Sequence, residues 1–504
     1  MLADSVMNNH VISYKIVSEF VSEFFEYFRK QLIKVYFLQI HRFIMPVDLL
    51  AVLRQRGRLG ARTLAEALGI SRATLMRAVR NAGEQIVTLG RARRTTYAAR
   101  RLLRGSATPL PLYQVNAHGE VQELGRLHLT FTPFSTALER LQELQWPLGR
   151  DFQEGWFDGL PYPLYDMRPQ GFLGRHFAAR YGEQLRVGDN PEHWTDDDVL
   201  YALSMLGEDT VGNLLIGETS CTRWLAHVAR IKAGEPSDAI VDEAVIEAYP
   251  QLAELAMSTG LPGSSAGGEF PKFTALRRHR QPGDFRHVLV KFSGSDASEG
   301  TQRWADLLIC EHWALETLRS KLGIAAAQTT LYRAGGRVFL EVDRFDRHGV
   351  LGRSALVSWT ALNGALFGVA GKSWGEVSRL LKARGWLNDQ DRIHLETLGL
   401  FGDLIANSDM HDGNLSFVPD SAGVRLAPAY DMLPMRYAPQ SGVELPRRLY
   451  APRLPLPAEQ AAWMNAARAA VYFWQATSDD ARISVGFRAI CAENALRLQT
   501  LISA

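Results

Sequence analysis

Apolar residues recur at helical spacing between positions 63 and 80, on both sides of Gly69. A glycine at this point favours a tight turn after one helix, and Ser71 is a typical N-cap for the next. Ala65, four residues before the glycine, is small enough to let two helices cross closely. The pattern therefore predicts a helix-turn-helix. Its small core is expected to contain Leu64, Leu68, Ile70, Leu75 and Val79.

Two short alternating segments follow at 85–89 and 95–98, and they predict a two-stranded wing with a basic tip. Residues 46–105 are therefore expected to form a winged helix-turn-helix domain. Residues 1–45 are crowded with Phe and Tyr amid charges and have no signal-peptide cleavage pattern. We expect them to be an upstream extension outside the native protein, with Met45 as the true start.

The pattern changes after a proline-containing linker at 106–111. Strand-like alternation runs from 112 to 131 around a central turn, which predicts a small β-rich region. Beyond residue 358 the apolar spacing is mostly helical. The body of the chain is therefore expected to be of the α+β class.

The charges of this chain are distributed unevenly. Between Leu53 and Arg104 there are thirteen arginines, no lysine and two glutamates, a net charge of +11, although the whole 504-residue chain carries only +2. The rest of the chain is therefore acidic. A basic module favours an anionic partner, first of all double-stranded DNA, although such a face can also dock on its own acidic body. The candidate DNA contacts on the second helix and the wing tip are Arg72, Thr74, Arg77, Arg80, Arg91, Arg93 and Arg94.

Composition indicates ordinary globular material, with 46% apolar and 22% charged residues. Cys221, Cys310 and Cys491 are scattered without a CxxC pair, which indicates neither a disulfide framework nor a zinc site. A reducing cytoplasm is the simplest location. No run of about 18 uncharged apolar residues occurs, so neither a membrane span nor a membrane partner is expected.

The segment from Asn407 to Phe417 carries the most informative chemistry. Asp409 lies five residues before Asn414, and Asp431 follows at the end of a short apolar run. Protein kinases space their catalytic Asp, their metal-binding Asn and their main magnesium ligand in this way. Phosphoryl transfer needs hard oxygen ligands for Mg²⁺ and a carboxylate that orients and deprotonates the attacking hydroxyl. A loop rich in Asp, Asn and Gly is, however, often only a solvated turn.

Two features upstream of this loop follow the order found in kinases. Residues 263–272 form a glycine-rich loop without a Walker pattern, whose small residues let backbone amides approach phosphate oxygens. Such runs are also common as flexible linkers. A short apolar strand predicted at 287–292 then places Lys291 where a kinase needs an ammonium group against the phosphates.

A helix and a hinge complete the series. Apolar spacing predicts a helix at 304–322, which offers Glu311 or Glu316 as the partner of Lys291, and we favour Glu311. Singly, either acid could simply face water on a surface helix. A strand predicted at 338–347 leads into a hinge that could contact adenine through its backbone. The joint order of these features favours an ATP-dependent kinase.

Two other classes of protein remain open. A metal-dependent nuclease or hydrolase would use Asp409, His411 and Asp412 as a metal cluster beside a DNA-binding module. This leaves Lys291 and the glycine-rich loop unexplained. A transcriptional regulator with an inactive kinase body is the other alternative, and the intact set of acids and amide argues against lost catalysis.

The same residues resemble the HipA family of serine/threonine kinase toxins. The resemblance extends from about Leu112 to the C-terminus, and the fused helix-turn-helix is typical of the YjjJ-like type. It implies a two-lobed protein-kinase-like fold with an N-lobe at 112–345 and a helical C-lobe at 346–504. The motifs that carry it are Ser264–Gly268 with Pro271 and Lys272, Asp343–Arg347, Leu404–His411 with Asn414, Ser416 and Phe417, and Pro428–Asp431.

The resemblance also implies roles for individual residues. Asp409 would be catalytic, Asn414 and Asp431 would bind Mg²⁺, and Ser264 would be autophosphorylated, with Ser265 as the second choice. The implied protein substrate is an aminoacyl-tRNA synthetase, and a homodimer is usual for this kind of DNA reader. The implied contacts with ATP are Ser265, Ala266, Gly267, Gly268, Lys272, Lys291, Glu311, Asp343, Arg344, Phe345 and His411.

Overall fold

A computed structural model describes residues 48–144, 146, 147, 149, 152–234, 238–258, 270–279, 281, 283–420, 422–439, 445 and 448–503. The expected extension at 1–45 and the loop residues Ser264, Ser265, Ala266, Gly267 and Gly268 lie outside the described residues. The chain divides into two compact units between Arg100 and Arg101, and each is described by itself.

The first unit contains the two helices predicted around Gly69. Gly69 ends the first of them in the left-handed conformation, with φ of 63°, and its N–H donates to the carbonyls of Ala65 and Glu66. Ser71 caps the second helix by accepting a hydrogen bond from the Thr74 N–H. The elements of the unit are α2 (Leu49–Arg56), β1 (Leu59–Gly60), α3 (Ala61–Leu68), α4 (Arg72–Ala82), β2 (Ile86–Leu89) and β3 (Thr96–Ala99).

The wing of the first unit is a three-stranded antiparallel sheet in the order β1-β3-β2. Strands β2 and β3 lie within one residue of their predicted positions. The sequence pattern did not predict α2, which buries Val52 and Leu53. The described part of the unit thus combines three α-helices with a three-stranded antiparallel sheet.

The second unit begins with a five-stranded sheet in the order β7-β6-β5-β4-β8. This sheet contains the strand-like alternation predicted after residue 112. Its strands are β4 (Leu110–Val115), β5 (Val121–Leu129), β6 (Thr136–Arg140), β7 (Trp156–Phe157) and β8 (Leu214–Ile216). The helices of this region are α5 (Gly171–Leu185), α6 (Asp196–Leu206) and α7 (Glu218–Lys232).

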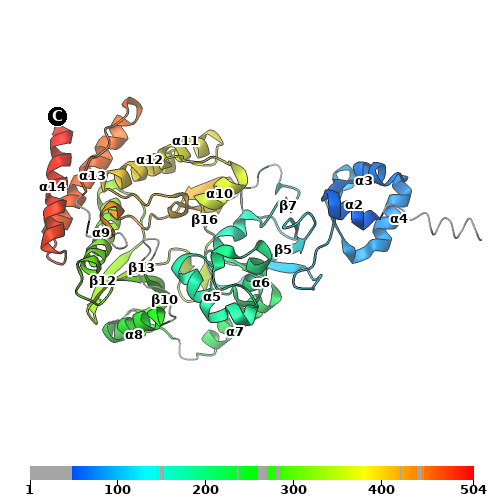
Figure 1. The fold of residues 1–504 in the computed structure, drawn as a ribbon, viewed down its shortest axis with the longest axis horizontal. Helices are drawn as coiled ribbons and strands as arrows, with labels where there is room; N and C mark the ends of the chain where they lie inside the picture. The colour runs from blue at the N-terminus through cyan, green and yellow to red at the C-terminus, as the bar shows by residue number, and fades with distance from the viewer. Residues whose placement is uncertain are drawn as a thin grey trace, which may run out of the picture. The chain divides into compact units, whose positions relative to one another are not determined.

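A second five-stranded sheet follows in the order β12-β13-β11-β10-β9. Helix α8 packs its apolar residues against one face of this sheet, and helix α9 lies on the other (Figure 1). The strands are β9 (Ile240–Val241), β10 (Lys272–Arg278), β11 (Phe285–Phe292), β12 (Thr329–Ala334) and β13 (Arg337–Asp343). The helices are α8 (Val245–Met257) and α9 (Glu299–Leu322).

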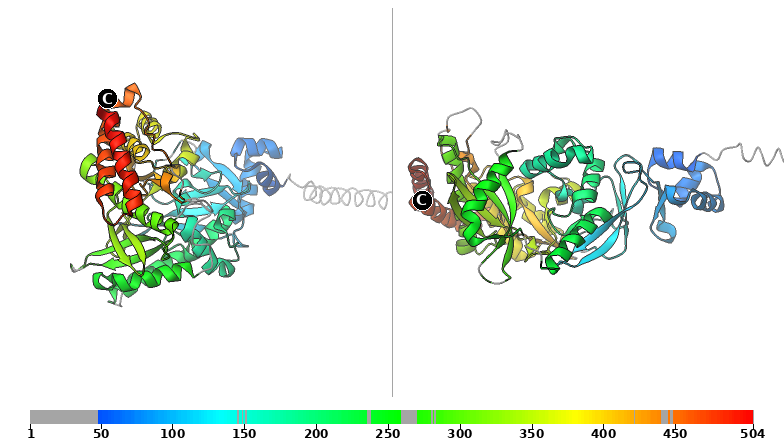
Figure 2. Two further views of the ribbon diagram at one scale, coloured as in Figure 1. Left: turned by 60° about the vertical axis from the view of Figure 1, so that its left-hand side comes forward. Right: turned by 90° about the horizontal axis from the view of Figure 1, so that it is seen from below.

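The C-terminal part of the second unit is mostly helical, as predicted. Helices α13 and α14 pack against each other at its end (Figure 2). Its helices are α10 (Trp359–Leu366), α11 (Trp374–Ala383), α12 (Asp389–Leu404), α13 (Gln460–Asp479) and α14 (Val485–Ser503). Its strands are β14 (Arg347–His348), β15 (Gly352–Arg353), β16 (Val357–Ser358), β17 (Ser416–Asp420) and β18 (Gly423–Leu426).

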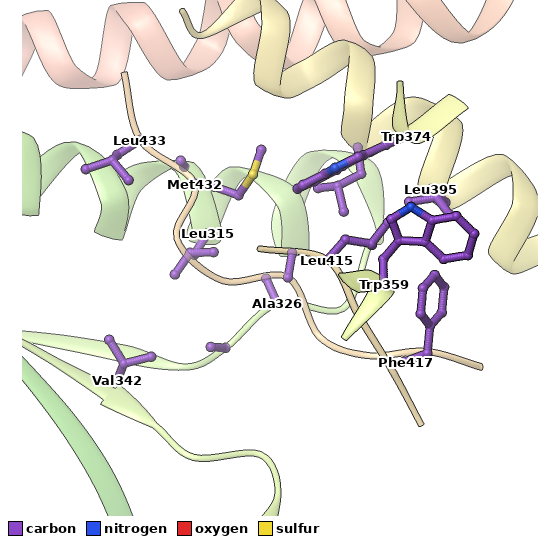
Figure 3. Close-up of a cluster of buried hydrophobic side chains, with 14 of the residues drawn as sticks. Leu315, Ala326, Val342, Trp359, Trp374, Leu395, Leu415, Phe417, Met432 and Leu433 are labelled. Atoms are coloured by element: carbon purple, nitrogen blue, oxygen red, sulfur yellow. The ribbon is translucent and has the colours of Figure 1, made fainter. Parts of the chain in front are cut away.

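One apolar core joins the second sheet to the helical part. Figure 3 shows Leu315 of α9 and Val342 of β13 in the same cluster as Trp359 and Trp374, and all four are buried. Met432 and Leu433, directly after the acid at 431, belong to this cluster as well. The sheet, the helices and the acidic loop are therefore held by a common core. The second unit is of the α+β class.

Two predicted boundaries differ from the structure. Helix α9 begins at Glu299 rather than at 304, because Ser298 caps it by accepting a hydrogen bond from the Thr301 N–H. The segment 338–347, predicted as a strand that leads into a hinge, is a strand as far as Asp343, and the chain then turns into the short hairpin β14-β15. Among the described helices, none is both long enough and apolar enough to cross a bilayer.

Candidate active site

The loop after α12 is shaped by Asn407, a buried residue. Its side-chain oxygen accepts a hydrogen bond from the Asp409 N–H at 3.0 Å, and its amide group donates to the Asp431 carbonyl at 3.4 Å. Ala406 and Asp431 have φ of 60° and 53°, in the left-handed region that side chains other than glycine rarely adopt. The surrounding hydrogen bonds hold this conformation, and such strain is typical of functional sites.

Asn414 is held by the same loop. Its side-chain N–H donates to the Asp409 carbonyl at 2.8 Å. Among the described residues, no hydrogen bond reaches its amide oxygen. Asn414 and Asp431 therefore present hard oxygen atoms of the kind that Mg²⁺ prefers, on two segments joined through Asn407.

Lys291 on β11 joins the sheet, helix α9 and the acidic loop. Its Nζ donates to Glu311 Oε1 at 2.6 Å and to Oε2 at 2.7 Å, and it also contacts Asp431 Oδ1. The Lys291 and Glu311 side chains are 4% and 0% exposed. Glu316 instead pairs with Arg319 near the surface. Of the two candidate glutamates, Glu311 is thus the one that the structure brings to Lys291.

The charges in this cluster perturb one another. Burial acts to lower the pKa of Lys291, but the Asp431 and Glu311 carboxylates outweigh it and raise that pKa. Burial acts to raise the pKa of Asp431, but Lys291 and then Lys272 outweigh it and lower that pKa. Lys291 therefore stays protonated and Asp431 ionised, the charge states that a phosphate contact and a metal ligand require.

Asp409 is half-exposed at the mouth of the site. Burial raises its pKa, the Asp431 carboxylate adds to this effect, and His411 opposes it. The Nε2 atom of His411 lies 3.9 Å from Asp409 Oδ1, while its Nδ1 accepts a hydrogen bond from the Gly413 N–H. A raised pKa suits a carboxylate that accepts a proton from a hydroxyl group.

The expected hinge residues lie in different surroundings. The Asp343 carboxylate pairs with Arg286 at 3.1 Å. The ring of Phe345 lies 6.0 Å from the ring of Tyr430, next to Asp431. The Arg344 guanidinium does not join the Lys291 cluster, because it pairs with the carboxylates of Asp209 and Asp346. Asp343 and Phe345 remain candidates for the nucleotide, and Arg344 remains one only through its backbone.

Arg344 belongs to a buried charge network between the hinge and the first sheet. Its guanidinium pairs with Asp209 at 3.2 Å and with Asp346 at 3.2 Å. Arg347 pairs with the same two acids, at 3.1 Å and 2.6 Å. The Asp346 carboxylate also accepts a hydrogen bond from the Gly212 N–H at 2.9 Å. The hinge is therefore anchored to the segment between α6 and β8.

Lys272 begins β10 and stands opposite Lys291 in the antiparallel ladder. Its charge reaches Asp431, as the lowered pKa of that carboxyl indicates. The metal cluster considered for a hydrolase, Asp409 with His411 and Asp412, has no support in the geometry. In the described part of the chain, no three His, Cys, Asp or Glu side chains gather closely enough to hold an ion. Asp412 instead accepts a hydrogen bond from Asn363 at 3.1 Å.

The residues predicted to bind DNA lie together on the first unit. Arg72, Arg77 and Arg80 are exposed on α4, and Thr74 is tied to Ser71 by a contact of 3.0 Å between their hydroxyl oxygens. The wing tip between β2 and β3 exposes its three arginines, Arg91, Arg93 and Arg94. Helix α4 and the wing tip therefore carry all seven candidates on one small domain.

Comparison with known proteins assigns the family. Residues 106–225 match the model of the YjjJ-like toxin middle domain, and residues 264–497 match the HipA-like C-terminal domain. Toxin YjjJ of Escherichia coli (strain K12) is 37% identical over 438 residues, which cover 87% of this chain and 94% of that protein. The chain belongs to the YjjJ-like family of HipA-type toxins.

Two solved structures are also similar to this YjjJ-like chain. One is the toxin HipA of Shewanella oneidensis MR-1, in complex with HipB and its operator DNA. The match covers 78% of this chain and 95% of the HipA chain, with 17% sequence identity and a TM-score of 0.44. The other is the proinflammatory kinase CtkA of Helicobacter pylori. This match covers 47% of this chain and 90% of the CtkA chain, with 13% sequence identity and a TM-score of 0.33.

Sequence reasoning missed one contact that supports the loop of this YjjJ-like chain. The half-buried carboxylate of Asp166 accepts hydrogen bonds from the Ser358 N–H and hydroxyl, both at 2.6 Å. Ser358 caps α10 and pairs with Ser416 at the start of β17, directly after the loop. The two partners are 192 residues apart, so no local signal could have paired them.

Proposed function

We propose that this chain is an ATP-dependent serine/threonine protein kinase of the toxin-antitoxin type. The observation that carries the proposal is the joining of Lys291 to both Glu311 and Asp431 across three separate elements. A lysine tied to a helix glutamate and set beside a metal-binding acid is the arrangement by which protein kinases hold nucleotide phosphates. Membership in the HipA-type family supports the same activity.

Each polar residue then has a role in phosphoryl transfer. Asp409 orients the hydroxyl of a serine or threonine and accepts its proton. Asp431 and the amide oxygen of Asn414 would hold Mg²⁺, which neutralises charge on the phosphates of ATP. Lys291 contacts the phosphates, and Glu311 keeps its ammonium in place. Phe345 and the Asp343 backbone would border the adenine.

Two further parts of the proposal concern substrates. We propose that the enzyme phosphorylates a protein, with an aminoacyl-tRNA synthetase as the first candidate, and itself at Ser264 or Ser265. Inactivating such a synthetase would halt translation, which would explain the toxicity recorded in the name of its relative from Escherichia coli. Both substrates rest on the family resemblance rather than on contacts in the structure.

We propose that the first unit binds double-stranded DNA and represses the operon of the protein. The exposed arginines of α4 and the wing support this, because a winged helix-turn-helix places its second helix in the major groove and its basic residues on phosphates. The fused domain would then replace a separate repressor subunit, and a homodimer would match a two-fold operator.

Incubation of the purified protein with radiolabelled ATP and Mg²⁺ tests the kinase proposal. Phosphoserine should form on the wild-type protein and be absent from Asp409→Asn, which removes the proton acceptor without changing the size of the side chain. Asp389→Asn, an exposed acid on α12, is the matched control and should retain full activity. Equal labelling of Asp409→Asn would overturn the assignment. A gel shift with upstream DNA tests the repressor proposal separately.

A further inference from the structure

A cavity lies beside strand β10, bordered by helices α7 and α8. Its volume is about 910 Å³, which is within the range of small-molecule sites. Trp224 of α7 and Leu252 and Leu255 of α8 contribute apolar walls. Neither Lys291 nor any of the three residues expected to bind metal or accept the proton lines it. Arg344, whose backbone remains a candidate for the nucleotide, does line it. The cavity therefore borders the hinge, but it excludes Lys291 and the residues assigned to the metal and to proton transfer.

A buried cation in the wall of this cavity has two carboxylates near it, Asp209 and Asp346, but forms a direct ion pair with neither. Arg353 is 3% exposed, and its guanidinium donates to the Glu208 carbonyl. Its Nε and Nη1 atoms are buried without a hydrogen-bond partner. Within the described part of the chain, no carboxylate forms an ion pair with it, whereas Arg344 and Arg347 nearby each pair with two acids.

An unpaired buried guanidinium is costly, since burial removes water from a charge without replacing its hydrogen bonds. Burial lowers the pKa of Arg353 to about 9, and the like charge of Arg347 adds to this effect, while the Asp209 carboxylate opposes it without cancelling it. The centre of the Trp224 ring lies 4.1 Å from the guanidinium carbon; this cation–π contact offsets part of the cost but supplies no hydrogen-bond acceptor for Nε or Nη1. Such an unsatisfied group calls for an explanation, and a bound water, ion or ligand is one such explanation.

Other polar groups of the cavity complete a binding site. Arg230 is exposed on α7, next to the ring of His227, with 3.5 Å between the nearest nitrogen atoms. The Trp224 Nε1 donor and the Glu208 Oε2 acceptor are buried, and neither has a hydrogen-bond partner among the described residues. The unsatisfied atoms of this cavity are thus mostly donors, accompanied by a single acceptor.

We propose that this cavity binds a small organic anion. Its carboxylate or phosphate would accept hydrogen bonds from Arg353, with Arg230 at the rim. Its apolar body would lie against Trp224 and Leu252, and a hydroxyl or amino group would donate to Glu208. A phosphate and a carboxylate share this chemistry, because both present several acceptor oxygens to a guanidinium. The site would let a small molecule bind to the same body as the proposed kinase.

Isothermal titration calorimetry of the full-length protein tests the proposal with simple probes. Phenyl phosphate and benzoate supply the two anionic groups on one apolar ring, and benzyl alcohol is the neutral counterpart. At least one of the two anions should bind, and benzyl alcohol should not. Binding of phenyl phosphate alone would assign a phosphate, and binding of benzoate alone would assign a carboxylate. Failure of both anions to bind would overturn the proposal.

Three variants locate the binding. Arg230→Gln, at an exposed position where folding is not at risk, should raise the Kd roughly fivefold, as expected for loss of one charge-assisted contact. Arg353→Met should abolish measurable binding while leaving the Tm unchanged or higher, since it removes an unsatisfied buried charge. Arg425→Gln, an exposed arginine on β18, should bind as wild type. Unchanged binding in both cavity variants, or displacement of the anion by ATP with Mg²⁺, would overturn the proposal.

Discussion

Replacing Lys291 with methionine should destabilise the second unit by an amount that depends on pH. The Lys291 ammonium donates to both oxygens of Glu311, which is fully buried. Removing it leaves an ionised carboxylate without a partner, which costs roughly 3–5 kcal/mol. The double variant Lys291→Met with Glu311→Leu should recover most of this loss, because the fully buried charge is then gone and Asp431, the other partner of Lys291, is 32% exposed to water.

The pH dependence follows from the pKa of Glu311. Burial raises this pKa above 4.5, its ordinary value, and Lys291 opposes that effect. Without Lys291 the folded protein therefore binds a proton at Glu311 more tightly than the unfolded chain does. A group whose pKa is higher in the folded protein than in the unfolded chain stabilises the fold fully at a pH below its pKa in the unfolded chain. This stabilisation is lost as the pH rises through the pKa in the folded protein. The loss relative to wild type should thus be smaller at pH 5 than at pH 8.

Guanidinium denaturation followed by tryptophan fluorescence measures this effect. All eleven tryptophans lie after Arg101, so the signal reports the second unit alone. Lys382→Met is the matched control, because Lys382 pairs with Asp389 at the surface at 3.0 Å. It should lose less than about 1 kcal/mol at either pH. An equal loss for Lys291→Met at both pH values, or a double variant as unstable as the single one, would refute the reasoning.

Three other changes have defined outcomes. Asn407→Ala should lower the autophosphorylation rate by on the order of a hundredfold, because Asp409 and Asp431 lose the amide that aligns them. The circular dichroism spectrum should be unchanged, and a rate within twofold of wild type would contradict this role. Arg77→Ala should weaken DNA binding in a filter-binding assay and reduce its salt slope by about one, if this residue contacts a phosphate; an unchanged slope would exclude that contact. Gly69→Ala should destabilise α3 and α4 by about 1 kcal/mol, measured by hydrogen exchange, because Gly69 has φ of 63°, in the left-handed region that alanine disfavours. Unchanged protection would show that the turn tolerates a side chain.

The sequence predicted the parts of this protein that depend on local signals. Gly69 and Ser71 define the helix-turn-helix through backbone conformation and capping, and both act within a few residues. The order of Lys291, Glu311 and the loop at 407–414 could be recognised because a functional spacing is preserved along the chain. These features needed no knowledge of distant contacts.

The parts that were not predicted depend on partners far apart in the sequence. Arg344 was expected at the nucleotide, but Asp209, 135 residues earlier, holds its guanidinium. The support that Asp166 gives to Ser358 spans 192 residues. Buried ion pairs of this kind have no periodicity, so a single sequence contains no signal that would join the two partners.

The charge network at the hinge constrains how this protein can change over generations. Asp209 lies in the segment that matches the middle-domain model, whereas Arg344 and Arg347 lie in the segment that matches the C-terminal model. A recombination event that exchanged one segment without the other would leave two guanidinium groups short of a counter-ion in the interior. The two modules are therefore expected to be inherited together. A chimera between distant relatives should fold only when Asp209 comes from the same parent as Arg344 and Arg347.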